Sequence, residues 1–267
     1  MNRFVINVIV CALGCAGCAS ASAQGVKAQA ALNQQATVDQ VLDALERRGR
    51  DLQSLRADVQ LTETDTALND SLGRSGSFAL QNRADGSTRA HVVFDKKVVD
   101  QKASSEKIEY ALADGRLIER NYNRKRQTTR SVLRPGEQMN LLKLGEGPFP
   151  LPIGQKRDDV LNQFDVRKIA ASHDDPADSI HLELTPKAGT SLARKFKSID
   201  TWVSVSDELP LRIKTLDFNG TTERTTDLAN VKINPDLTDA DFALLTIDEK
   251  DWNLVEEPLR EPQPRTK

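Results

Sequence analysis

The stretch Leu55-Arg56-Ala57-Asp58-Val59-Gln60-Leu61-Thr62 decides the fold class. Apolar residues stand at every second position, so an extended chain here has one apolar and one polar face. This alternation is typical of an antiparallel strand with one face on a core. A sheet of many short strands is predicted because the same period returns in Phe78–Leu80, Ala90–Phe94, Ile108–Leu112, Ile180–Leu184 and Leu209–Phe218.

Turns and helices complete the expected architecture. Asp114-Gly115 and Asn219-Gly220 lie between alternating stretches and are typical of tight hairpins. A helix is expected over Thr37 to Leu52, where Thr37 and Gln40 have the spacing of a capping box and apolar residues follow at helical intervals. A short helix is also expected over Asp158 to Phe164. Helices beside an antiparallel sheet define an α+β fold.

The composition excludes several classes of protein. The chain has 267 residues, of which 38% are hydrophobic, and its mean hydropathy is −0.49. A multispanning membrane protein is therefore excluded. With 37 basic against 39 acidic residues, the net charge of −2 argues against nucleic-acid binding, which requires a basic excess. Nothing in the composition calls for an oligomer, and a monomer is expected.

The first 23 residues read as a secretory signal. The apolar run Phe4–Leu13 follows Arg3, and Ala21-Ser22-Ala23 has the form that signal peptidase accepts. Cleavage after Ala23 predicts an exported, periplasmic protein that begins with a flexible leader over residues 24–36. A competing interpretation takes Cys18, or less well Cys15, as the lipidated first residue of a membrane-anchored lipoprotein. All 3 cysteines lie in this segment, so a chain cut after Ala23 has none.

One domain is expected over residues 37–250, followed by a charged, Pro-rich tail over 251–267. Inside the domain, prolines separate the apolar side chains of Phe149, Leu151 and Ile153. Since proline lacks the backbone donor, this stretch cannot be a helix interior or a central strand. The apolar loop either packs as a fixed plug or forms a lid at the mouth of a hollow.

Residues typical of catalysis are scarce. His91, His173 and His181 show no metal-ligand spacing, and no nucleophile elbow or phosphate-binding glycine loop occurs. We therefore expect no enzyme, no metal site and no cofactor. Binding is the better hypothesis for such a chain.

A strongly curved antiparallel sheet with helices over its concave hydrophobic face encloses an apolar hollow lined by every second residue. Burial contributes about 0.8 kcal/mol per methylene, so one long acyl chain gains on the order of 10 kcal/mol there. The residues predicted to line the hollow or its mouth are Val59, Leu61, Phe78, Leu80, Phe94, Tyr110, Phe149, Leu151, Ile153 and Trp202.

The order of motifs resembles the LolA-like family of periplasmic lipoprotein carriers, from about Val38 to Phe242. The residues that carry the resemblance are Leu182–Lys187, Phe196–Val203, Leu209–Arg212, Leu216–Gly220 and Asn230–Asn234. The resemblance implies an incomplete β-barrel closed by helices, with acyl chains of lipoproteins or lipids as the ligand.

The resemblance also implies partners and one further residue. Cargo would be loaded by an inner-membrane transporter and passed to an outer-membrane acceptor. Arg83 stands nearest to the family's functional arginine and is a candidate contact for a headgroup or lid, although no proline follows it as in the family. The alternative hypothesis is an envelope sensor or structural protein that uses the same half-barrel to bind a protein partner.

Overall fold

The computed structural model describes residues 32–100, 102–132 and 154–259. Its helices are α1 (Val38–Asp51) and α2 (Arg157–Gln163), with single 3₁₀ turns η1 (Leu192–Arg194), η2 (Asp239–Asp241) and η3 (Glu249–Asp251). Its strands are β1 (Ser54–Asp65), β2 (Asp70–Asn82), β3 (Thr88–Val99), β4 (Lys102–Ala113), β5 (Arg116–Asn121), β6 (Arg126–Ser131), β7 (Phe164–Lys168), β8 (Ser179–Pro186), β9 (Phe196–Ser204), β10 (Pro210–Asp217), β11 (Thr222–Ile233) and β12 (Asn253–Glu257).

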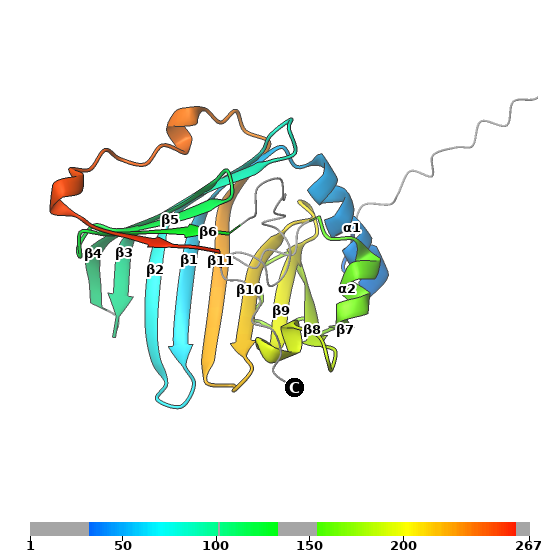
Figure 1. Ribbon diagram of the computed structural model, residues 1–267. Coiled ribbons are helices and arrows are strands. Elements are labelled where there is room, and N and C mark those ends of the chain that lie inside the picture. Colours follow the sequence, from blue (N-terminus) through cyan, green and yellow to red (C-terminus); the bar gives the residue numbers. More distant parts are fainter. Residues whose placement is uncertain (1–31, 101, 133–153, 260–267) are drawn as a thin grey trace, which may run out of the picture. The chain divides into compact units, whose positions relative to one another are not determined.

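The described strands form one 12-stranded sheet in the order β12-β6-β5-β4-β3-β2-β1-β11-β10-β9-β8-β7. Neighbouring strands are antiparallel, except that β12 runs parallel to β6. The sheet bends strongly and its two edge strands, β12 and β7, do not pair, so the barrel is incomplete (Figure 1). The predicted α+β half-barrel is confirmed.

Helix α1 begins where the sequence predicts. Both hydrogen bonds of the capping box between Thr37 and Gln40 are present, so the N–H groups of these two residues are satisfied at the start of the helix. The buried residues of α1 share one stripe: Val41, Leu42, Ala44 and Leu45. We call the sheet face that packs on this stripe the concave face, and the opposite one the convex face.

The predicted Asp-Gly hairpin is also confirmed. Asp114 and Gly115 alone connect β4 to β5, and both have positive φ, 51° and 72°. A two-residue loop with this backbone matches the right-handed twist of the strands it joins.

The C-terminal segment corrects one sequence-based boundary. Residues 253–257 were expected in a tail, yet they form β12, which pairs with β6. Ion pairs to the sheet stabilise this strand, including Arg130 to Glu257 at 2.8 Å. Contacts with a strand more than 100 residues away leave no local pattern, so the sequence predicts only a charged tail here.

Residues 234–252 lead to β12 across the convex face (orange to red in Figure 1). Arg89 of β3 pairs with Asp239 at 2.8 Å, and its guanidinium lies 4.0 Å from the ring centroid of Phe242. Arg56 of β1 forms an ion pair with Asp241. This segment therefore straps β1 and β3 from outside.

Candidate functional site

Strand register places one continuous row of residues on the concave face. Val59 of β1 faces Gly76 of β2, Gly76 faces Phe94 of β3, and Phe94 faces Ile108 of β4. A second row, parallel to the first, crosses the same four strands at a distance of two residues on each strand. Its members are Ala57, Phe78, Val92 and Tyr110.

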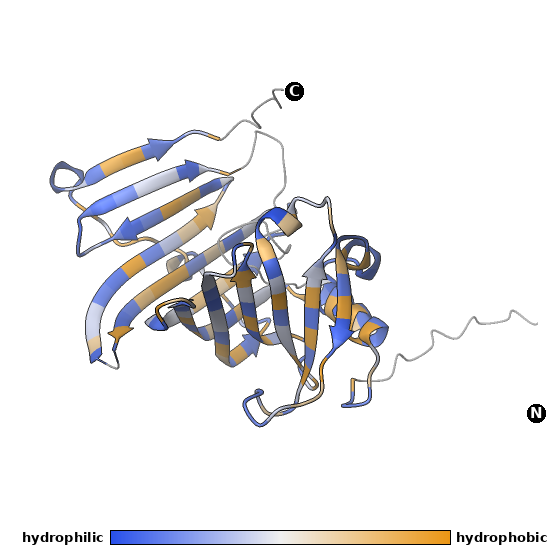
Figure 2. Cartoon of the chain, turned by 90° about the horizontal axis from the view of Figure 1, so that it is seen from below, coloured by the Kyte–Doolittle hydropathy of each residue, from blue (hydrophilic) through white to orange (hydrophobic). Residues whose placement is uncertain are grey.

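Six of the predicted lining residues come together on this face. Val59, Phe78, Leu80 and Phe94 are buried in one cluster that includes the α1 stripe, while Leu61 and Tyr110 are partly buried against it. The rings of Phe94 and Tyr110 meet edge to face, with centroids 6.3 Å apart. The banding of apolar and polar residues along the strands is visible in Figure 2.

Trp202 lies on the other face of the sheet. Its partner on β8 is His181, whereas the adjacent pair Ile180 and Val203 faces the core. The indole stacks on His181, with centroids 4.1 Å apart, and Nε1 donates to Asp175 at 2.6 Å. Its assignment to the apolar lining is therefore corrected: the alternation of Ile199, Thr201 and Val203 already sets the phase that turns Trp202 outward.

Asp175 shows how polar the surroundings of Trp202 are. Burial opposes the charged carboxylate, but hydrogen bonds from the Ser172 N–H and the Trp202 indole outweigh it and hold the pKa below its ordinary value. The side chain of Arg212 lies 5.6 Å from the Trp202 ring centroid. The residues of this convex-face cluster contact one another, so the Trp202 indole has little surface left for contact with an acyl chain.

Arg83 is the remaining predicted site residue that the structure describes, and it is not part of the concave cluster. Arg83 lies in the turn between β2 and β3, where Nη1 donates to Asp114 Oδ1 at 3.2 Å. It thus bridges two hairpin turns at one end of the sheet. Phe149, Leu151 and Ile153 lie outside the described residues. The signal segment and residues 260–267 of the predicted tail lie outside them too.

The sequence analysis missed three charged side chains on the concave face. Arg74, opposite Leu61 of β1, pairs through Nε with Glu106 Oε2 at 2.8 Å. Lys97, opposite Arg74, has Nζ 4.0 Å from Glu106 Oε1. The alternation through Leu80, Phe78 and Gly76 continues to Arg74, so the sequence could have placed Arg74 on this face. Lys97 and Glu106 could not be placed in this way, because β-bulges in β3 and β4 shift the alternation.

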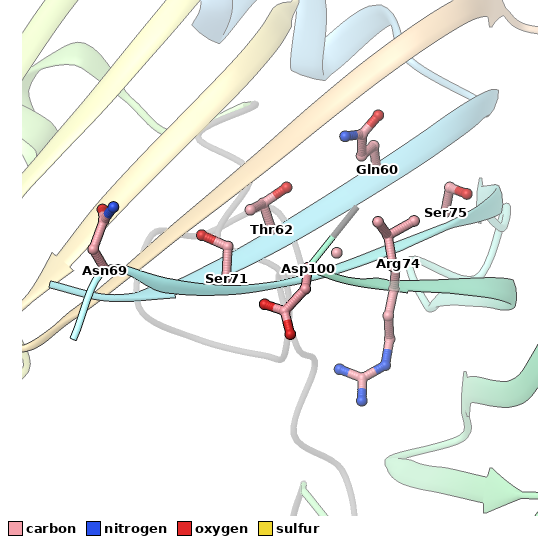
Figure 3. A pocket seen from close by; sticks show the side chains of 9 residues that line it. Gln60, Thr62, Asn69, Ser71, Arg74, Ser75 and Asp100 are labelled. Atoms are coloured by element: carbon pink, nitrogen blue, oxygen red, sulfur yellow. The ribbon is translucent and has the colours of Figure 1, made fainter. Parts of the chain in front are cut away.

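A groove of about 390 Å³ runs along β1 and β2 on the convex face. Figure 3 shows Gln60, Thr62 and Ser71 on one side of these strands, with Arg74 pointing to the other. An adjoining groove of about 440 Å³ is lined by Asp58, Asp95, Lys96 and Asp227 among others. The charged groups of this second groove do not suit an acyl chain.

Within the part of the chain that the structure describes, no three His, Cys, Asp or Glu side chains gather as a metal site would require. None of the helices in this part is long and apolar enough to cross a membrane.

No family model and no curated protein matches the chain. Among solved structures it is similar to an uncharacterized conserved protein from Thermus thermophilus, at 15% identity over 81% of this chain and 97% of that one, with a TM-score of 0.46. It is also similar to MucB in the MucA/MucB complex of Pseudomonas aeruginosa, at 12% identity over 77% of this chain and 60% of that one, with a TM-score of 0.41.

A third solved structure carries the name of the family that the sequence motifs resemble. It is a LolA superfamily protein from Nitrosomonas europaea, at 12% identity over 78% of this chain and 98% of that one, with a TM-score of 0.31.

Proposed function

We propose that the protein is an exported lipid carrier or chaperone that holds acyl chains of lipoproteins or lipids on its concave face for transfer towards the outer membrane. The observation that carries this proposal is the continuous apolar surface on the concave face of β1 to β4, which belongs to one buried cluster with the apolar stripe of α1. Its rows contain Val59, Phe78, Phe94 and Ile108, and all four are buried.

The polar contacts of α1 lie away from the apolar rows of β1 to β4. Arg47 pairs with Glu208 at 2.6 Å, Arg48 donates to the Asp207 carbonyl at 2.7 Å, and Glu46 accepts from the Arg157 N–H at 3.0 Å. These contacts tie the helix to the turn after β9 and to α2. An acyl chain on the rows of β1 to β4 would therefore leave them in place and replace only non-directional apolar contacts.

Lipid capture is the direct test. Native mass spectrometry of protein purified from its own host should detect bound acyl lipid, and the delipidated protein should take up a fluorescent fatty acid. A protein that carries no lipid and captures no probe would contradict the proposal.

A matched pair of variants localises the site. Leu61→Trp fills the concave face, while Thr62→Trp adds the same ring to the convex face one residue later. We expect weaker probe capture only for Leu61→Trp, with circular dichroism used to check that both variants fold. Equal loss in both variants, or in neither, argues against the concave face.

Export and handover are further parts of the proposal. Intact-mass analysis should find the mature chain starting at Gln24. A lipid-modified Cys18 or Cys15 as first residue would replace the shuttling carrier with an anchored acceptor. Loading by an inner-membrane transporter and delivery to an outer-membrane acceptor would appear as lipid transfer between reconstituted membranes.

Binding of a protein partner is a second candidate function. It is favoured by the grooves on the convex face, where the hydroxyls of Ser71, Ser75 and Ser77 can form hydrogen bonds with a polypeptide. Co-purification of one defined protein, without lipid, would support this function over the carrier.

A further inference from the structure

The concave face is not apolar throughout. The row that contains Val59, Phe94 and Ile108 is followed, one step nearer the β1–β2 and β3–β4 turns, by Arg74 and Lys97 together with Glu106. All three are partly buried: the exposed fractions of their side chains are 24%, 33% and 15%. Charged groups thus lie directly beside the apolar surface.

These three residues, which we call the Arg74 triad, carry one positive charge more than they carry negative charges. Arg74 uses Nε for Glu106, and Lys97 reaches the same carboxylate only at 4.0 Å. A guanidinium has five N–H donors and an ammonium three. The Arg74 triad therefore retains donors and net positive charge on a half-buried surface.

A second group of charges on the same face has the opposite balance. Arg130 of β6 pairs with Glu119 at 2.9 Å and with Glu257 at 2.8 Å, so the two carboxylates exceed the one guanidinium. Tyr110 lies between the two groups. Burial chiefly raises its pKa, Glu119 adds to the rise, and Arg74 and Arg130 oppose it. An anion on this face is therefore attracted more strongly to the Arg74 triad than to the group around Arg130.

We propose that the Arg74 triad binds the anionic headgroup of the lipid whose acyl chain lies on the apolar rows. The inference rests on the proposed carrier function and narrows its cargo to acyl lipids with an anionic oxygen group, either a phosphate or a carboxylate. The chain would point towards Phe94 and the headgroup towards the open hairpin end. Charge-assisted hydrogen bonds from Arg74 and Lys97 would fix this orientation.

The test compares three probes with the same two oleoyl chains: dioleoylphosphatidylglycerol, dioleoylglycerol succinate, whose anion is a carboxylate, and dioleoylglycerol, which is neutral. Competition against a fluorescent fatty acid gives their relative affinities. We expect the anionic probes to bind about 3- to 10-fold more tightly than dioleoylglycerol, a range typical of partly screened ionic hydrogen bonds. Salt at about 1 M, where the screening length is about 3 Å, should reduce the difference.

Neighbouring lysines supply the matched control. Lys97 belongs to the Arg74 triad, whereas Lys96 is exposed and lines the convex groove. Lys97→Met should lower the preference for anionic probes about 3-fold or more, and Lys96→Met should not change it. Glu106→Gln, which leaves two cations without their carboxylate, should raise the preference.

Each outcome decides one question. Preference for phosphatidylglycerol alone assigns a phosphate, and an equal preference for dioleoylglycerol succinate extends the site to carboxylates. Lipid binding without headgroup preference, or the same effect from Lys96→Met and Lys97→Met, overturns this inference but leaves the carrier function. Failure to bind any of the three probes overturns the carrier function itself.

Discussion

Tyr122 and Trp252 meet edge to face, with ring centroids 5.1 Å apart and planes at 84°. Tyr122 follows β5, and Trp252 precedes β12. This pair therefore joins the end of segment 234–252 to the edge of the sheet at which β12 is added. On its other side, the Tyr122 hydroxyl donates to Glu109 Oε2 at 2.6 Å. One side chain thus connects β4, the β5–β6 turn and the C-terminal segment.

The two tyrosines of the chain should titrate late in the folded protein. Burial and the hydrogen bond to Glu109 raise the pKa of Tyr122 to about 12, and burial also raises the pKa of Tyr110 above 10.0. Tyrosinate absorbance should therefore stay low at pH 10 and rise there on unfolding. If the tyrosines of the native protein are half titrated at pH 10, their pKa values are not raised and the prediction is wrong.

The same shift predicts how stability depends on pH. Between pH 10 and 12 the unfolded chain releases the Tyr122 proton while the folded chain retains it, so stability is complete below pH 10 and falls as the pH rises. Tyr122→Phe should reduce this alkaline loss. Urea denaturation of both proteins at several pH values measures the difference.

Gly76 should tolerate no side chain. A Cβ there would lie 1.7 Å from the Val93 carbonyl oxygen and 2.9 Å from Phe94 Cα, so the backbone of β3 would have to move. Gly76→Ala is expected to cost about 1–3 kcal/mol of unfolding free energy, as overpacking does. Gly73→Ala is the control, since its Cβ would lie an ordinary 3.5 Å from Val98 Cβ. Equal costs by chemical denaturation would rule out the close contact as the cause.

The cap of α1 should contribute measurably to stability. Thr37→Ala removes the hydroxyl that accepts from the Gln40 N–H and is expected to cost about 1 kcal/mol. Thr37→Ser retains an oxygen at this position and should restore most of the loss. If both variants match the parent in chemical denaturation, the capping box is not stabilising.

Trp252→Ala should loosen β12 without disturbing the concave cluster. Loss of the aromatic pair is worth about 0.5–1.5 kcal/mol beyond the buried area. We expect faster amide exchange in β12 and unchanged exchange in β1 and β2, measured by hydrogen exchange with mass spectrometry. Faster exchange throughout the sheet would show that β12 supports the whole fold and not only its own edge.

The fold was accessible from sequence wherever one face of an element sets the pattern. The alternation from Leu55 to Leu61 gives the orientation of β1, and Thr37 and Gln40 give the start of α1. Two-residue turns such as Asp114-Gly115 are equally local. These features depend on neighbours in the chain, so they appear directly in the sequence.

The site was less accessible because it depends on register. Trp202 was assigned to the lining from sequence, but its pairing with His181 turns it to the convex face. The Arg74 triad joins three strands across two β-bulges, which shift the alternation. β12 depends on pairing with a distant β6. Such long-range pairings have no sequence period.

The parallel pairing of β12 with β6 also has a consequence for the order of folding. Synthesis proceeds from the N-terminus, so β6 is complete more than 120 residues before Asn253 is added. Until then its outer edge presents free N–H and C=O groups to any other extended chain. Protection of the nascent protein against aggregation therefore depends on its final residues, and a chain terminated early should aggregate through an edge that the finished protein keeps covered.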